Sequence, residues 1–243
     1  MKIKTLTTLL FAISLSAIVS PAYGQKSRWT DWSKKDAERV LTNSPWAQTQ
    51  TDTDISEMFF SPTASPTSPR RPANDSARLG QGATNQSVDV KFHLRFFSAR
   101  PIRRALTRLI EIDNRPDAET AAKLHNFAEL KSTDSIILTL SFETSDQRYA
   151  GQVMQSMNSA VTATLKNESY LEYKGKRLFL EEYIPPGKDG FGARFIFLKN
   201  PDGQPFISTD EGEVRFVTKY PSGLKVNRVF KLSDMQLDGN LEY

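Results

Sequence analysis

The sequence predicts an α+β fold over about residues 88–243, and two features of its pattern indicate this class. The chain first runs strand, helix, helix, strand, helix, and about five strands separated by turn signals then fill the C-terminal third. Helices that are segregated from a run of strands pack against a face of the sheet. We therefore expect a mixed β-sheet with about three helices on one face, preceded by a short N-terminal helix and a disordered tether.

The first part of this domain holds a strand at 88–96, helices at 102–110 and 117–130, a strand at 135–142 and a helix at 145–165. The first strand alternates apolar and polar residues, as a strand with one buried face does. Ser98 could cap the helix that follows it. The helix at 145–165 has the most regular apolar face, and we expect it to be continuous.

The last third is predicted to be β-structure. A hairpin fits residues 170–174 and 177–182, with Gly175-Lys176 as a type II′ turn. This register places Tyr173 opposite Leu178 and Leu171 opposite Leu180. Further strands are expected at 193–198, 213–219 and 224–232.

Residues 1–24 have the pattern of a cleavable export signal. Lys2 and Lys4 precede an apolar run over 6–19, and Ala22-Tyr23-Gly24 places small residues at a cleavage site. That run is shorter than the roughly 20 residues that span a bilayer. After cleavage we expect an exported chain without a transmembrane segment, in the periplasm or outside the cell.

The composition of the exported chain excludes several classes of site. Without Lys2 and Lys4, 30 Lys and Arg face 28 Asp and Glu, so the charge gives no reason to expect a nucleic-acid partner. The absence of cysteine excludes disulfides, thiolate nucleophiles and the usual zinc cages. No cofactor motif is present, and we expect no cofactor and no metal.

Residues 25–48 form a segment that holds all three tryptophans of the chain, Trp29, Trp32 and Trp46. Its helix has readable ends, because Ser33 can cap it with Asp36 three residues on and Pro45 follows it. The tryptophans could dock on a partner, dock on their own domain or meet a membrane surface. Residues 49–87, rich in Pro, Ser and Thr, are predicted to be a disordered linker to the domain at 88–243.

Several short blocks of the sequence occur together in a known family. They are Trp32 with LTNSPWA at 41–47, SARP at 98–101, FIS at 206–208, FKLSDM at 230–235 and DGNL at 238–241. With these blocks the chain resembles a family of exported bacterial proteins of unknown function that share an N-terminal SPWA motif. The resemblance implies export and the domain outline, and it carries no activity and no site residues.

The helix at 102–110 and its start carry a basic stripe. Arg100, Arg104 and Arg108 are spaced by four residues, and Arg103 lies beside them. Guanidinium groups in a row suit phosphate or carboxylate recognition, so an anionic glycan, an anionic lipid or an acidic envelope protein is a candidate partner. The alternative is a helix face whose arginines pair with acids such as Glu111.

Catalytic groups are sparse. His93 falls on the solvent side of its strand and His125 flanks the apolar face of a helix, and no nucleophile motif accompanies either. We therefore expect no catalytic residues and a non-enzymatic binding or interaction module of the cell envelope. The alternative is a carboxylate-dependent hydrolase acting on envelope polymers, which needs two carboxylates about 5–10 Å apart in a cleft.

Overall fold

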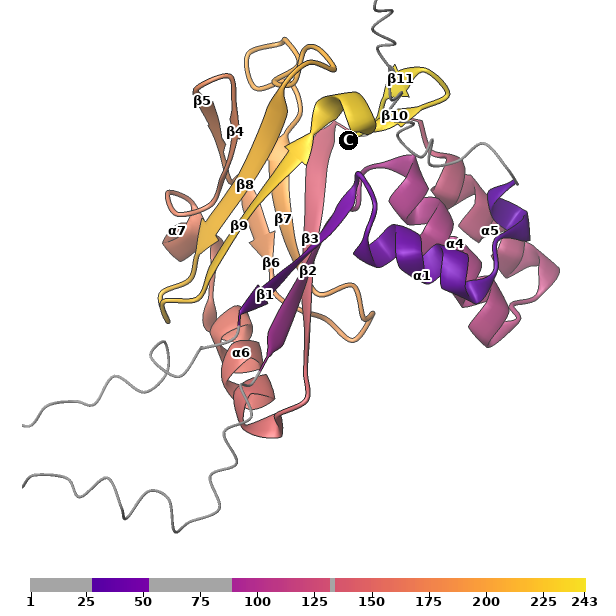
Figure 1. Ribbon diagram of the computed structural model, residues 1–243, viewed down its shortest axis with the longest axis horizontal. Coiled ribbons are helices and arrows are strands. Elements are labelled where there is room, and N and C mark those ends of the chain that lie inside the picture. The colour runs from indigo at the N-terminus through magenta and orange to yellow at the C-terminus, as the bar shows by residue number, and fades with distance from the viewer. Residues whose placement is uncertain (1–27, 53–88, 132–133) are drawn as a thin grey trace, which may run out of the picture.

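The structure is a computed structural model that describes residues 28–52, 89–131 and 134–243 (Figure 1). The α+β class is confirmed within these ranges: antiparallel β-sheets enclose the core and helices lie outside them. The predicted signal at 1–24 and most of the predicted linker lie outside the described residues. The linker's first four residues, 49–52, are described and belong to a strand of the fold, which corrects the predicted boundary.

Five strands form the larger sheet. In spatial order they are β1 (Ala47–Asp52), β2 (Val90–Phe96), β3 (Ser135–Thr144), β7 (Ala193–Leu198) and β6 (Glu182–Ile184). Each pair of neighbours is antiparallel. Strand β3 lies in the middle, as its apolar sequence predicts. The N-terminal segment supplies the edge strand β1, so it is part of this sheet and not a separate unit.

The second sheet has the order β5 (Lys176–Phe179), β4 (Tyr170–Tyr173), β8 (Glu213–Lys219) and β9 (Lys225–Lys231), and it too is antiparallel. A small hairpin, β10 (Gln236–Leu237) with β11 (Asn240–Leu241), follows it. The domain thus has two antiparallel sheets instead of the single mixed sheet that the sequence predicts. Short turns join β4 to β5 and β8 to β9, and such connections make neighbouring strands antiparallel.

Side chains of β1 join the two sheets along one edge. Gln48 donates from Nε2 to the Val229 carbonyl over 2.7 Å, and Gln50 donates from Nε2 to the Lys225 carbonyl over 2.9 Å. The main-chain N–H of Asn227 donates to Oε1 of Gln50 over 3.0 Å. These bonds satisfy main-chain groups at the edge of β9 that have no neighbouring strand to pair with.

The core lies between the two sheets and is rich in phenylalanine. Phe195 of β7 contacts Phe216 of β8 with ring centroids 5.1 Å apart, and Phe96 of β2 contacts Phe230 of β9 at 4.8 Å. All four rings are fully buried. These contacts show that the inner faces of the sheets pack on each other through edge-to-face aromatic pairs.

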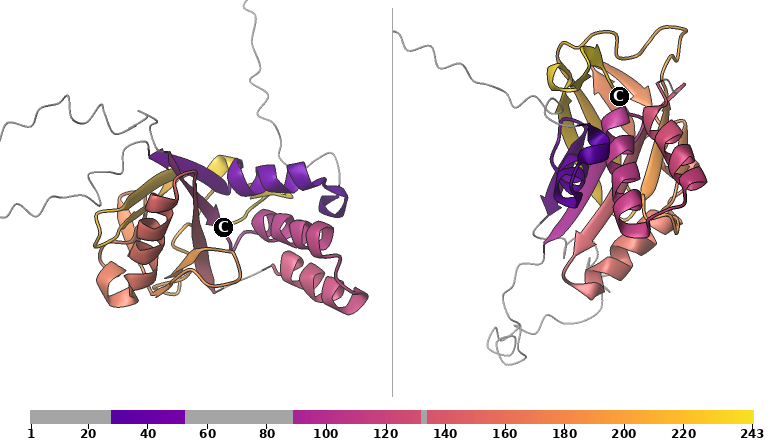
Figure 2. Two further views of the ribbon diagram at one scale, coloured as in Figure 1. Left: turned by 90° about the horizontal axis from the view of Figure 1, so that it is seen from below. Right: turned by 90° about the vertical axis from the view of Figure 1, so that its right-hand side faces the viewer.

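The helices lie in two groups (Figures 1 and 2). One group is α1 (Lys34–Thr42), α4 (Arg100–Asn114) and α5 (Ala118–Glu129), with the 3-10 turn η1 (Trp29–Asp31) beside it. The other is α6 (Gln147–Ser159) and α7 (Thr162–Leu165), which contact β3 and β6. A second 3-10 turn, η2 (Leu232–Asp234), follows β9. The helices therefore form two separate groups, and not the predicted set of three helices on one face.

Two helix starts differ in how well the sequence predicts them. At α1 the capping box is confirmed, because Ser33 Oγ accepts from the Asp36 N–H and the Asp36 carboxylate accepts from the Ser33 N–H, each over 3.2 Å. At α4 the N-cap is Ala99, with Pro101 in the first turn. Ser98 does not cap; its hydroxyl accepts from the Ile137 N–H over 3.1 Å.

The helix predicted at 145–165 is broken. It ends at Ser159, and Val161 is extended, with φ −132° and ψ 162°. The Tyr183 N–H donates to the Thr162 hydroxyl over 3.0 Å, which ties the short α7 to β6. Helical periodicity within the segment does not predict this tertiary contact or the break.

The β4–β5 hairpin has a different register from the predicted one. Leu171 pairs with Leu178 and Tyr173 with Lys176, two residues away from the expected partners. The turn is Lys174-Gly175, whose φ angles of 48° and 75° are both positive, as a type I′ turn requires. A shift of two residues keeps the same side chains on the buried face, so the predicted apolar face is retained.

Candidate binding site

A pocket of about 310 Å³ opens between η1, α1, α4 and the β10–β11 hairpin. All three tryptophans of the chain contribute to its wall. The remaining lining residues are Arg28, Thr30, Val40, Pro101, Arg104, Glu129, Leu237 and Asp238. The pocket therefore combines an aromatic wall with two basic and two acidic side chains.

Trp46 anchors the N-terminal segment to its own domain. It is 2% exposed, and its Nε1 donates to the Glu242 carbonyl over 2.8 Å. The Trp46 carbonyl accepts from the Phe96 N–H over 2.9 Å. Trp46 thus docks on its own domain, which is one of the alternatives that the sequence leaves open. It is not exposed for a separate partner.

Trp29 and Trp32 are held less deeply. Trp29 donates from Nε1 to Oε1 of Glu129 over 2.8 Å and lies 4.9 Å from the His125 ring, centroid to centroid. Trp32 packs against the core and its carbonyl accepts from Nε of Arg108 over 2.8 Å. Because the indole N–H of Trp29 has a partner, this half-buried residue leaves mainly the carbon surface of its ring to the pocket.

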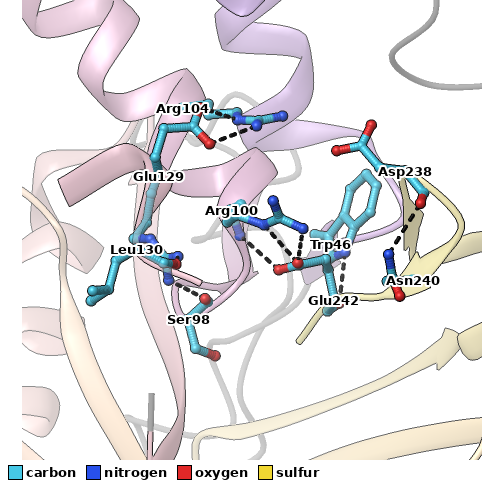
Figure 3. A network of polar contacts seen from close by, with 10 residues as sticks. Trp46, Ser98, Arg100, Arg104, Glu129, Leu130, Asp238, Asn240 and Glu242 are labelled. Carbon is cyan, nitrogen blue, oxygen red and sulfur yellow. Dashed lines mark hydrogen bonds and ion pairs between the residues drawn. The ribbon is translucent and has the colours of Figure 1, made fainter. Parts of the chain in front are cut away.

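The arginine stripe of α4 is a set of internal contacts. Arg100 donates from Nε to Oε1 of Glu242 over 2.6 Å, and Arg104 makes two bonds to the Glu129 carboxylate, over 2.8 and 2.7 Å (Figure 3). The hydrogen bond to Glu242 raises the pKa of Arg100. Both guanidinium groups are therefore neutralised within the chain.

Arg103 and Arg108 are likewise engaged. Arg103 is 2% exposed and donates to the carbonyls of Ser98 and Leu130. Arg108 donates to the Trp32 carbonyl and pairs with Glu111 at 3.4 Å. The arginines are therefore paired within the chain, as the alternative expects, and the anion site predicted at Arg100, Arg103, Arg104 and Arg108 stays a prediction whose guanidinium groups already have internal partners.

The two acids of the pocket differ in their surroundings. The pKa of Glu129 is lowered, chiefly by its hydrogen bonds with Arg104, and the Trp29 N–H adds to this. Asp238 lies in the turn of the β10–β11 hairpin with φ 52°, is exposed, and its carboxylate has no hydrogen-bond partner among the described residues. Figure 3 shows Asp238 beside Trp46. Asp238 is therefore the carboxylate in the pocket that is free for a ligand.

The histidines lie outside the pocket. His93 is 9% exposed, which corrects its predicted place on a solvent-facing side, and its Nδ1 is 2.9 Å from the Thr49 hydroxyl. Its Nε2 is 3.6 Å from Glu143. This row of hydroxyl, imidazole and carboxylate resembles a catalytic triad in outline. However, the Thr49 hydroxyl has two acceptors within reach, Nδ1 of His93 and the Thr42 carbonyl 3.1 Å away, so it is not committed to the histidine.

His125 has a partner of its own, since its Nε2 is 2.5 Å from Oε1 of Glu111. His125 contacts the pocket lining through its ring, which packs against Trp29. Neither histidine is placed in the pocket as a base. Among the described residues, no group of three or more His, Asp or Glu is arranged to hold a metal ion. Within the same ranges, no helix combines the length and apolar character that crossing a membrane requires.

Sequence reasoning identified the tryptophans and Arg104 but missed that they share a pocket. Pro101 and Asp238 lie in the SARP and DGNL motifs, to which no site role is attached, and Leu237 and Glu129 carried no signal. An Asp-Gly pair such as Asp238-Gly239 is typical of a turn, and this is the one signal from which an exposed hairpin near the C-terminus could have been predicted. Comparison with known protein families, with curated proteins and with solved structures finds no match to this chain.

Proposed function

We propose that this protein is an exported, non-enzymatic binding module of the cell envelope and that the tryptophan-lined pocket is its ligand site. The observation that carries the proposal is the convergence of Trp29, Trp32 and Trp46 on one pocket. Ligand sites are concave, mostly apolar and aromatic, with a few fixed polar groups, and this pocket has that composition. Its volume lies near the lower end of the usual range of about 300–1,000 Å³.

Export is supported by the signal pattern at 1–24 and by the resemblance to exported proteins with an SPWA motif. Under this proposal, the SPWA motif has a structural role. Pro45 and Trp46 fix the turn from α1 into β1, and Trp46 closes the inner side of the pocket.

Binding is favoured over hydrolysis by the state of the two acids. A carboxylate-dependent hydrolase needs one acid that retains its proton near neutral pH. In this pocket Glu129 has a lowered pKa and its oxygens accept from Arg104 and Trp29. Glu129 is thereby fixed as a structural anion whose two oxygens are already bonded, so it serves neither as the proton donor nor as the free nucleophile beside Asp238.

The proposal is tested by sedimentation of the 25–243 chain with purified envelope fragments. Trp32→Ala and Asp238→Ala alter the pocket, whereas Phe179→Ala removes a ring that is 44% exposed on β5 and serves as the matched control. We expect co-sedimentation to fall for both pocket variants and to stay unchanged for the control. Equal retention of all variants would contradict the proposal, and release of soluble fragments that Asp238→Ala abolishes would favour the hydrolase.

A further inference from the structure

We infer that the ligand is an uncharged oligosaccharide that extends over two adjoining hollows, one on each side of the β10–β11 hairpin. This inference rests on the proposed function, because its first subsite is the tryptophan-lined pocket. Leu237 and Asp238 of the hairpin face that pocket, while Gly239, Asn240 and Leu241 line a second hollow of about 530 Å³. A ligand longer than one ring can therefore pass over the hairpin from one hollow to the other.

The second hollow is polar where the first is aromatic. Its hydroxyl, amide and carboxylate side chains belong to Ser208, Thr209, Asp210, Gln236 and Asn240. Gln236 donates from Nε2 to Oδ2 of Asp210 over 2.8 Å, which leaves its amide oxygen to accept. The Asn240 side chain donates to the Asp238 carbonyl over 3.1 Å, and its own oxygen has no partner in the part of the chain that the structure describes (Figure 3). Such groups serve sugar hydroxyls, which both donate and accept.

The charges of the two hollows balance. Three cationic side chains, Arg28, Arg104 and Lys199, stand against three acidic ones, Glu129, Asp238 and Asp210. Arg104 is bound by Glu129 on two atoms. The Lys199 ammonium lies 4.4 Å from the centroid of the Tyr243 ring, and burial lowers its pKa. This lining offers no concentrated positive charge, so it does not select a polyanion.

The aromatic wall suits the apolar side of a sugar ring. The Trp29 N–H is bonded to Glu129, so its half-buried ring offers mainly carbon surface beside the half-buried ring of Trp32, while Trp46, 2% exposed, lies behind them. A pyranose ring has one face of C–H groups that packs on such a surface, with its hydroxyls at the rim. Asp238, free and exposed at that rim, can accept from two of them.

The experiment is a titration followed by tryptophan fluorescence. Because all three tryptophans line the first hollow, a change in emission reports on that hollow. The probes are the tetramer and monomer of β-1,4-linked N-acetylglucosamine, the tetramer and monomer of α-1,4-linked glucose, and an oligogalacturonate as acidic control. The variants of the 25–243 chain are Trp32→Ala for the first hollow and Gln236→Ala with Asn240→Ala for the second, each checked for an unchanged melting profile.

We expect at least one neutral tetramer to change the emission and to bind about tenfold more tightly than its monomer, with little dependence on salt. The double variant of the second hollow should weaken the tetramer about tenfold, the effect of losing one or two hydrogen bonds, and leave the monomer within about twofold. Trp32→Ala should weaken both.

Three results would overturn the inference. They are binding of the acidic oligosaccharide alone with a steep salt dependence, equal affinity for tetramer and monomer, and no response to any saccharide. If envelope retention still depends on Trp32 in those cases, the pocket remains the binding site and only the saccharide class fails. If retention is also independent of Trp32, the proposed function fails with it.

Discussion

Arg100 and Glu242 form an ion pair that fastens the start of α4 to the C-terminal strand region, with Nε and Oε1 2.6 Å apart and each side chain 11% exposed. The carbonyl of the same Glu242 accepts the Trp46 indole N–H (Figure 3). One residue thus holds both the basic helix and the tryptophan segment, and the inner wall of the pocket depends on it.

Glu242→Gln is expected to lower the free energy of unfolding by roughly 2–4 kcal/mol, because it leaves the Arg100 guanidinium without a counter-charge at a nearly buried site. Urea denaturation measures this. The matched control is Lys123→Ala, which breaks the exposed pair of Lys123 with Glu119 on α5 and should leave stability nearly unchanged. Equal effects of the two changes would contradict the assigned role of Arg100 and Glu242.

Trp46→Ala is expected to cost about 3–5 kcal/mol, because a large buried ring is removed and a cavity remains. Trp46→Phe retains much of the packing and loses the hydrogen bond to Glu242, so it should cost less. Thermal unfolding of the parent protein, Trp46→Phe and Trp46→Ala ranks their stabilities. A Trp46→Ala protein as stable as the parent would show that the N-terminal segment does not dock on its own domain.

The hydrogen bonds from the β1 side chains to β9, which join the two sheets, lead us to expect a local effect of Gln50→Ala. This change removes the acceptor of the Asn227 N–H and the donor to the Lys225 carbonyl. We expect faster hydrogen exchange at the Asn227 amide and a loss of about 1 kcal/mol in stability. The Val226 amide of β9, whose residue pairs with Thr218 of β8, serves as an internal reference. Unchanged exchange at Asn227 would show that Gln50 does not hold β9 to β1.

His93 predicts a pH dependence of stability. Burial is the main cause of its lowered pKa, Arg95 and Lys91 act in the same direction, and Glu143 opposes them. The unfolded chain has the ordinary value of about 6.5, so between that value and the lower folded one the unfolded state binds more protons. The stabilising contribution is present above pH of about 6.5 and is lost as the pH falls through the folded pKa.

His93→Gln should therefore flatten the fall in stability below a pH of about 6.5, measured by urea denaturation at a series of pH values. The control is His125→Gln, because the His125 imidazole is partly exposed and belongs to a different contact with Glu111. An unchanged pH profile in His93→Gln would contradict the buried, neutral state assigned to His93.

Local patterns predicted the parts of the fold that depend on neighbouring residues. The capping box of Ser33 and Asp36 and the strands β7 and β8 follow from short stretches of sequence, and the structure confirms them. The predicted hairpin register is wrong because the turn places two residues, Lys174 and Gly175, at positive φ. Lysine rarely adopts positive φ, so the sequence gives no signal for a turn that begins at Lys174.

The candidate site was harder to predict, because its contacts join distant parts of the chain. The partner of Arg100 lies 142 residues away, and the partner of Trp29 lies 100 residues away. A stripe of arginines has the same sequence pattern whether it binds an external anion or pairs internally. Only the fold decides between the two, and it places Glu129 and Glu242 on the stripe.

The most direct test of the central claim is a ¹H–¹⁵N spectrum of the 25–243 chain, which contains one indole signal for each of the three tryptophans. Envelope fragments released as soluble pieces are added, and the shifts are followed. Binding at the pocket predicts that the indole signals move together with the amide of Asp238, at one common concentration. Shifts confined to other surfaces, such as β5, with all three indole signals unmoved would contradict it.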